Sequence, residues 1–121
     1  MLRVEIQARQ ESVTLRCSGR IVLGLEAEAL RCMATSRKEQ LLMLDLANVG
    51  AVDAAGLGLL VELQGWARQH NRVLRILNPS AGVRRIIALT WLYLVLSIAE
   101  SSDAGLDWES DSGFRQRAMT A

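Results

Sequence analysis

The spacing of hydrophobic residues near the N-terminus predicts a β-hairpin. Apolar and polar side chains alternate over residues 2–7 and again over residues 12–18. A period of two is typical of a strand that turns one face to solvent. The polar residues between the two segments predict the hairpin connection, and Gly19 is expected to end the second strand.

From residue 25 onward, helical and strand patterns alternate. Residues 25–36 and 54–70 place apolar side chains at helical spacing and therefore predict helices. Residues 41–46 and 73–77 are short, almost continuously apolar runs. Such runs are typical of strands that are covered on both faces, and their position between helical segments favours that interpretation.

The expected helix starts carry polar residues that suit cap positions. Asp53 is expected to cap the second helix and Ser80 the third, because both side chains can accept hydrogen bonds from free backbone N–H groups. Residues 83–87 give the third helix its apolar side, and residues 93–98 predict a last strand. The order β-β-α-β-α-β-α-β predicts an α/β fold, a single domain with a mixed, mostly parallel β-sheet and helices packed on it.

The composition agrees with one folded domain followed by a tail. The chain has 121 residues, of which 50% are hydrophobic and 22% charged, which is ordinary for a single globular domain. Residues 1–100 carry the predicted elements, whereas residues 101–121 are acidic and contain Ser and Gly. We expect this C-terminal tail to be weakly structured or loosely docked, with Trp108 and Phe114 as anchors.

Charge and cysteine content argue against several classes of protein. The 14 basic and 13 acidic residues give a formal net charge of +1, which argues against nucleic-acid binding. Two cysteines, Cys17 and Cys32, and one histidine argue against a structural zinc site. The cysteines either form one disulfide or are buried thiols, and buried thiols are the favoured interpretation. No secretory leader is visible, and the apolar residues 86–99 are too short to span a bilayer. We therefore expect a cytoplasmic protein without membrane insertion.

The sequence favours a binding protein over an enzyme. It contains neither a phosphate-binding loop of the Walker type nor a Ser-His-Asp set with suggestive spacing. His70 is expected in the last turn of a helix, where it suits the helix dipole, and no cofactor or metal is expected. Trp66 has the spacing of a core residue, and Gly56 and Gly58 are expected to permit close helix packing.

The sequence leaves two interpretations open for residues 91–93 and for Asp45, and favours a structural role for Arg84 and Arg85. Residues 91–93 either fill the end of the core, the favoured interpretation, or form an exposed apolar patch for a partner or for self-association. Asp45 either satisfies loop N–H groups or supports a site. Arg84 and Arg85 are expected to lie on the solvated face of the third helix.

Five segments match, in order, the pattern of one known family. They are Leu44 to Val49, Val52 to Gly58, Arg72 to Pro79, Val83 to Ile87, and Ser18 to Ile21 with its glycine after the second strand. Together they resemble the STAS domain family, whose best-known members are bacterial anti-sigma factor antagonists. The resemblance covers residues 1–100 in element order and implies a STAS-like single domain.

The resemblance also implies a site at the start of the second helix. In the antagonists the loop there usually reads Asp-Ser-Ser-Gly or Asp-Ser-Thr-Gly, and a partner that is both kinase and anti-sigma factor phosphorylates a hydroxyl in it. The acceptor position corresponds to Ala55 and the preceding one to Ala54, so phosphorylation at the usual site is chemically excluded. Val22 stands where relatives often carry a polar residue, and Trp91 where they often carry glycine.

By this resemblance the chain is a non-catalytic protein-binding module. The implied partner is a histidine-kinase-like ATPase that acts as an anti-sigma factor. The expected partner-binding residues are Asp53, Ala54, Ala55, Gly56 and Leu57, with Asp45 and Asn48 as supporting polar residues. Two alternatives stay open, a STAS subunit of an ABC-type lipid-transport system and a structural subunit of a multi-STAS signalling assembly, which would form oligomers.

Overall fold

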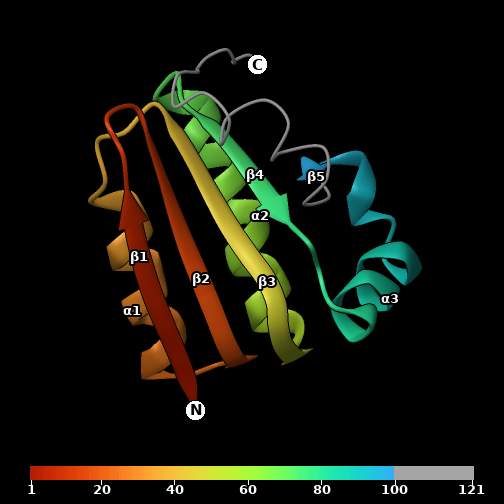
Figure 1. Ribbon diagram of the computed structural model, residues 1–121. Coiled ribbons are helices and arrows are strands. Elements are labelled where there is room, and N and C mark those ends of the chain that lie inside the picture. Colours follow the sequence, from red (N-terminus) through yellow and green to blue (C-terminus); the bar gives the residue numbers. More distant parts are fainter. Residues whose placement is uncertain (100–121) are drawn as a thin grey trace.

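Five strands form one sheet whose spatial order is the same as the order of the strands in the chain, β1-β2-β3-β4-β5 (Figure 1). The computed structural model describes residues 1–99. The strands are β1 (Leu2–Ala8), β2 (Ser12–Ile21), β3 (Leu41–Val52), β4 (Val73–Leu77) and β5 (Ile98–Ala99). The helices are α1 (Leu25–Thr35), α2 (Ala54–Gln69), α3 (Ala81–Leu89) and the short 3₁₀ helix η1 (Leu92–Leu94).

The pairing of the strands confirms the predicted fold class. β1 and β2 are antiparallel, as the hairpin prediction requires, and every later pair is parallel. The predicted caps are confirmed too, because Asp53 accepts a hydrogen bond from the Gly56 N–H and Ser80 accepts one from the Val83 N–H. The predicted tail, residues 101–121, lies outside the described residues.

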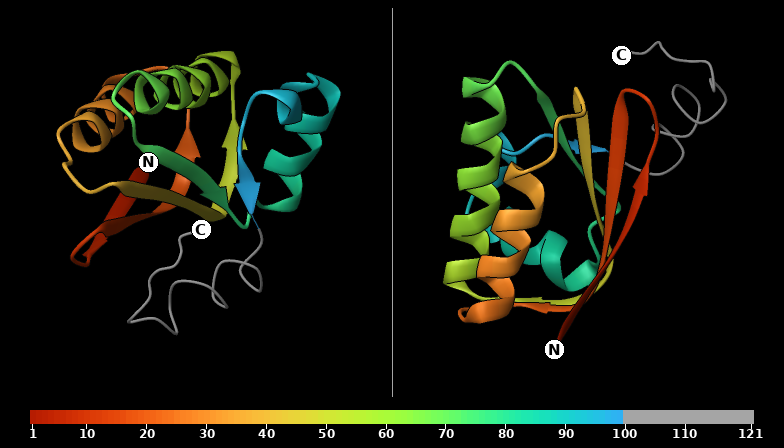
Figure 2. Two further views of the ribbon diagram at one scale, coloured as in Figure 1. Left: turned by 90° about the horizontal axis from the view of Figure 1, so that it is seen from above. Right: turned by 90° about the vertical axis from the view of Figure 1, so that its left-hand side faces the viewer.

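All three α-helices lie on one side of the sheet (Figure 2). Crossovers between parallel strands are right-handed. Each new strand is added on the same side of the preceding one, so the order of the strands across the sheet follows the chain. Each crossover therefore places its helix on the same face. The main core lies between that face and the helices; it includes Val13, Leu15, Leu42, Leu44, Leu74 and Ile76 from the strands and Leu30, Leu60, Leu63, Val83 and Ile87 from the helices.

β2 continues past Gly19, so the prediction that this glycine ends the strand is wrong. Gly19 has a φ of +112°, and a Cβ there would collide with the backbone of the N-terminal residue. The register shifts between Gly19 and Arg20, and pairing then continues to Ile21 opposite Val52. At this shift β2 advances one residue and β3 two, so the irregularity leaves Gly50 of β3 as the extra residue, opposite Gly19 and Arg20. Because the pairing continues, β3 also runs beyond its predicted end at Leu46.

The prediction of a strand over residues 93–98 is wrong for most of its length. Trp91 follows α3 in the left-handed conformation, with a φ of +63°, and η1 begins at the next residue. The backbone bonds of this segment are local, such as the 2.9 Å bond from the Val95 N–H to the Leu92 carbonyl. A strand needs an extended chain with partners on a neighbouring strand, and only Ile98–Ala99 meet that condition, against β4.

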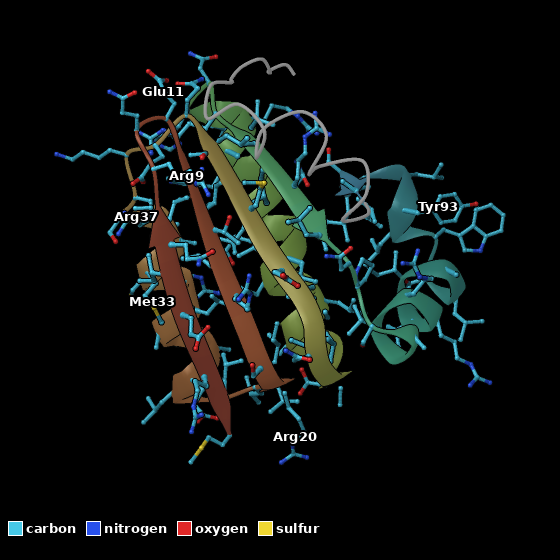
Figure 3. All side chains as sticks on the ribbon, viewed as in Figure 1. Arg9, Glu11, Arg20, Met33, Arg37 and Tyr93 are labelled. Carbon is cyan, nitrogen blue, oxygen red and sulfur yellow. The ribbon has the colours of Figure 1, made fainter. Side chains whose placement is uncertain are left out.

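Two aromatic residues of this segment face solvent rather than the core. Trp91 is 65% and Tyr93 51% exposed, so the favoured core interpretation is wrong for both. Figure 3 shows Tyr93 pointing away from the sheet and the helices. Leu92 packs partly buried against the core, in agreement with that interpretation. The exposed apolar patch consists of Leu89, Trp91, Tyr93, Leu94 and Val95.

The C-terminal end of α2 has the structural role expected for its side chains. His70 is the C-cap residue, and its Nδ1 lies 2.8 Å from the Trp66 carbonyl oxygen. The rings of these two residues are 5.0 Å apart, and the guanidinium of Arg72 lies 5.4 Å from the Trp66 ring centre. Trp66 is half-buried and packs against the core, close to its expected place.

The two cysteines are free and occupy opposite environments. Cys17 is fully buried on the helix side of β2, as expected, whereas Cys32 is exposed on α1, so the expectation of two buried thiols is wrong for Cys32. Burial, with a smaller contribution from the charge of Asp45, raises the pKa of the Cys17 thiol to about 12. Because the thiolate is the reactive form, Cys17 is protected twice, by its neighbours and by its protonation.

We expect a thiol reagent at pH 8 to label one cysteine in the native protein and both after denaturation. Mass spectrometry of the peptides should place the native label on Cys32. A Cys32→Ser variant supplies the control, because it should show no rapid native labelling. Rapid labelling of Cys17 in that variant would contradict the buried, protonated state.

Candidate functional site

Asp53 joins the start of α2 to the loop that follows β2. One carboxylate oxygen accepts a hydrogen bond from the Gly56 N–H at 2.8 Å, and the other accepts one from the Leu23 N–H at 3.0 Å. The aligned ends of β2 and β3, where Ile21 lies opposite Val52, bring the loop and the helix start together. The predicted cap is therefore also a brace between two segments that are 30 residues apart.

These two backbone donors favour the charged carboxylate. The N–H groups of Leu23 and Gly56, in that order of effect, hold the pKa of Asp53 below its ordinary value. Hydrogen bonds to the ionised form produce this direction of shift. The folded state therefore binds a proton to Asp53 less readily than the unfolded chain does, and the brace contributes stability above the ordinary pKa of an aspartate.

We expect Asp53→Ala to lower the thermal midpoint by a few degrees at pH 7, since an N-cap bond and the bond to the loop are both lost. The difference from the unmodified protein should shrink as the pH falls through the lowered pKa of Asp53, because protonation removes the charge-assisted bonds there. Asp53→Asn keeps a side-chain acceptor and should lose less stability at pH 7. A difference that is constant from pH 7 to pH 3 would contradict this account. Thermal unfolding followed by circular dichroism measures all three proteins.

Gly56 allows α2 to begin directly against the end of β2. A Cβ at this position would overlap the Ile21 carbonyl oxygen and lie 2.8 Å from the Val52 Cγ1 atom. At Gly58, two residues farther along the helix, a Cβ would meet nothing within 4 Å. The close-packing prediction is therefore confirmed for Gly56 and wrong for Gly58, which faces open space.

The five predicted partner-binding residues differ in their accessibility. Asp53 and Ala54 are exposed and Ala55 is half-buried, so these three lie together on the surface. Gly56 and Leu57 are buried beneath them and shape the surface without lying on it.

Two exposed leucines beside Asp53 were not predicted from the sequence as part of the site. Leu23 is 80% and Leu25 87% exposed, and both lie in or next to the loop that Asp53 braces. The sequence does contain a pattern that could have identified them, because the spacing of Leu23 and Leu25 does not match the apolar face of α1. We call Leu23, Leu25, Asp53, Ala54 and Ala55 the helix-start surface. Figure 3 shows Arg20, which is exposed, at the same end of the molecule.

The two predicted supporting residues lie elsewhere on β3. Asp45 accepts a 3.0 Å hydrogen bond from the Ala47 N–H and lies 3.6 Å from Arg16. A strand rises about 3.3 Å per residue, so the eight positions from Asp45 to Asp53 correspond to roughly 26 Å. The bond to Ala47 agrees with the interpretation that Asp45 satisfies backbone N–H groups. Asn48 is exposed opposite Ser18 of β2.

Within residues 1–99, no cluster of three or more His, Cys, Asp or Glu side chains could hold a metal ion. None of the helices in this part of the chain is long and apolar enough to cross a membrane. The helix-start surface itself has apolar side chains, one braced carboxylate and no hydroxyl group among residues 53–57. Residues 53–57 therefore present apolar side chains, backbone groups and a single carboxylate.

Comparison with known proteins agrees with this architecture. A family model described as "Mlab, STAS domain" matches residues 4–93. No curated protein sequence matches the chain. Among solved structures, the unphosphorylated anti-sigma factor antagonist SpoIIAA is 16% identical with a TM-score of 0.72, and the match covers 94% of this chain and all of SpoIIAA.

Two further solved structures have the same fold. A putative anti-sigma factor antagonist from Thermotoga maritima is 18% identical with a TM-score of 0.74, and the match covers 84% of this chain and 90% of that one. An anti-sigma factor antagonist from Mycobacterium paratuberculosis is 18% identical with a TM-score of 0.69, with coverage of 88% and 92%. At these identities the likeness concerns the fold.

Proposed function

The chain belongs to the Mlab STAS domain family, and from this premise we propose that it is a non-catalytic, cytoplasmic module that binds a protein partner through the helix-start surface. Residues 1–100 form the binding domain in this proposal, and residues 101–121 form a separate tail. The partner is a histidine-kinase-like ATPase that acts as an anti-sigma factor. The solved anti-sigma factor antagonists with this fold support an anti-sigma factor as the partner.

One observation carries the proposal, the exposure of Leu23 and Leu25 beside a helix start that is held in place by Asp53. Apolar surface that is removed from water on binding contributes about 25 cal/mol per Å². A surface that is already ordered loses less conformational entropy when a partner docks. An apolar loop fixed by a brace has both properties.

Because residue 55 is alanine, phosphorylation at this position cannot change the charge of the surface. A phosphate would add about −1.5 to −2 charges at pH 7, but the alanine side chain has no oxygen to carry one. In our proposal the surface stays in its binding-competent form, and binding is regulated through the amount of the protein or through changes in its partner.

A second candidate partner is the ATPase subunit of an ABC-type lipid transporter. The observation in its favour is that the matching family model is described as Mlab and not as an antagonist. Both candidates use an ATPase partner and the same surface, so the identity of the captured protein separates them.

The test is affinity capture from cells of the source organism, read by mass spectrometry, with Ala55→Asp as a paired bait. An aspartate in the first turn of α2 suits the helix dipole, so this variant should fold. Burial of its unpaired charge against a partner should reduce recovery about tenfold or more. Leu89→Asp, which places the same charge on the separate exposed patch, is the matched control and should retain the partner.

Each outcome of this capture has a meaning. A histidine-kinase-like ATPase that is lost with Ala55→Asp and kept with Leu89→Asp supports the proposal. Transporter subunits with the same dependence support the second candidate. Equal recovery by all three baits would show that the interface lies away from the start of α2.

A further inference from the structure

β1 lies at one edge of the sheet, and no described strand lies beyond it (Figure 1). It is seven residues long, and its register with β2 runs from Leu2 to Ala8 without a shift. The strand at the opposite edge, β5, has only two residues in the described part of the chain. Proteins ordinarily protect a sheet edge by keeping it short or by interrupting it with a proline or a bulge. β1 has none of these three features, so its edge is a regular template for another strand.

The backbone groups on the outer side of this edge belong to every second residue of β1. The Leu2 N–H donates a 3.0 Å hydrogen bond to the Glu26 carboxylate of α1, so it points away from β2. Residues of an antiparallel strand turn their backbone groups alternately toward and away from the neighbouring strand. The N–H and carbonyl groups of Val4 and Ile6 therefore point outward as well. Among residues 1–99, neither residue forms a backbone hydrogen bond outside the β1–β2 pair.

A row of alternating charges crosses the sheet and ends at the same edge. The register places Asp45 beside Arg16 and Arg16 beside Glu5. Arg16 lies 3.6 Å from the Asp45 carboxylate and 4.0 Å from that of Glu5. The row is therefore negative, positive and negative, and its last carboxylate has a cation on one side only. Two positions away on the same face, Arg3 is exposed and forms no ion pair among residues 1–99.

We propose that β1 pairs with β1 of a second copy of the chain, antiparallel about a twofold axis at Val4. This register places the outward backbone groups of Val4 opposite each other and those of Leu2 opposite Ile6, as a hydrogen-bonded ladder requires. It also places Arg3 opposite Glu5 on both sides of the axis. Each arginine then extends the charged row of the other copy.

Other registers do not satisfy the same groups. A shift of the second strand by two residues in one direction places Arg3 opposite Arg3, and in the other direction Glu5 opposite Glu5. Like charges that lie directly opposite each other destabilise a pair of strands. A shift by one residue would place the polar face of one strand beside the apolar face of the other. The charges of β1 therefore select the register centred on Val4.

The apolar side chains of β1 match each other in the same register. Leu2 and Val4 pack partly buried against the main core, whereas Ile6 is 45% exposed. Pairing brings Val4 beside Val4 and the exposed Ile6 beside Leu2 of the other copy. Directly opposed apolar side chains stabilise paired strands, so the apolar layer continues from one copy into the other.

α1 borders this edge with side chains that suit a close neighbour. Glu26 lies on the side of α1 that faces β1, because it holds the Leu2 N–H. Ala29 and Met33 follow at helical spacing on that side. Ala29 is exposed and Met33 half-buried. A second copy would thus meet small or uncharged side chains there, and the Glu26 bond can persist in the dimer.

A dimer of this kind joins the two sheets into one and carries the helix-start surface twice. The inference rests on β1 and does not depend on the proposed partner. Its test uses the purified protein alone, so its failure would leave the capture experiment unaffected.

The test is sedimentation equilibrium of the full-length protein over about a hundredfold range of concentration. We expect the mean mass to rise from that of one chain to that of two. Arg3→Glu and Glu5→Arg each create a like-charge contact, and the twofold axis repeats it. Each variant should therefore dimerise at least about tenfold more weakly.

A mixture of the two variants tests the register itself. One variant is acidic at both positions and the other basic, so the mixture should form dimers with about the affinity of the unmodified protein. This recovery also shows that both variants are folded. Arg85→Glu, which reverses an exposed charge on α3, is the matched control and should leave the affinity unchanged.

Three outcomes would overturn the proposal. The first is the mass of one chain at every concentration, and the second is a mixture that dimerises no better than its components. The third is a dimer that withstands both charge reversals but is lost on Trp91→Gly, which would assign the contact to the exposed apolar patch after α3.

Discussion

Gly56→Ala should reduce the free energy of unfolding by about 3 kcal/mol, at the upper end of the range for overpacking a close contact. The added methyl group would overlap the Ile21 carbonyl oxygen and press on the Val52 side chain. Backbone on both sides of the contact is fixed, by β2 pairing with β3 and by the Asp53 brace. The start of α2 would therefore have to move away from the sheet. Urea denaturation followed by circular dichroism measures the change.

Gly58→Ala is the matched control in the same helix. Its methyl group enters open space, and alanine is a better helix former than glycine by about 0.5–1 kcal/mol. We therefore expect this variant to be slightly more stable than the unmodified protein. If the two alanines had the same effect, helix propensity and not contact with β2 would govern both positions.

Leu44→Ala should reduce the free energy of unfolding by about 3–5 kcal/mol, as for other leucines truncated in a tight core. Leu44 is fully buried at the centre of the sheet, between Leu15 of β2 and Ile76 of β4. Strands on both sides are paired, so the surrounding structure has little freedom to close the cavity. The loss combines the transfer of the side chain from the core with the remaining void.

Leu89→Ala is the corresponding control outside the core. Leu89 is 71% exposed on α3, and substitutions at such sites usually change stability by less than about 0.5 kcal/mol. Both variants are measured by the same urea titration. A small loss for Leu44→Ala with an unchanged denaturant slope would show that the sheet relaxes around the truncated side chain.

The parts of the fold that could be predicted are those with local signals. The hairpin, α1, α2 and β4 follow from periodicity within a dozen residues or so, and the caps Asp53 and Ser80 act on N–H groups three residues ahead. The second half of β3 gives no such signal. Asn48 and Gly50 are poor strand residues by propensity, and only the pairing with β2, which continues past the register shift at Gly50, keeps this segment extended.

The segment after α3 shows the same limit. Its apolar residues are nearly continuous, and such a run suits a strand as well as a helix. The left-handed conformation of Trp91 decides the outcome, and a bulky aromatic residue gives no local warning of it. Once the chain turns there, Leu96 reaches the core and the neighbouring side chains remain outside.

The candidate site was predictable as a position on the chain but not as a surface. Asp53 as a helix cap follows from residue type, whereas its bond to the Leu23 N–H depends on how β2 and β3 end side by side. That bond makes the exposed Leu23 part of the site. Asp45 does not belong to this surface, because the extended conformation of β3 separates it from Asp53 by about 3.3 Å for each residue between them.

The identical order of the strands in the chain and in the sheet bears on folding during synthesis. Each strand pairs with the one that the ribosome has delivered just before it. The β1–β2 hairpin can form first, and β3, β4 and β5 then add in turn at one growing edge, each bringing the crossover that precedes it. Among the described strands, none has to be inserted between two strands that were synthesised before it. A nascent chain of this kind exposes the outer edge of β1 and its newest edge, and only the newest edge changes as synthesis proceeds, which limits the opportunity for misassembly that unpaired strand edges provide.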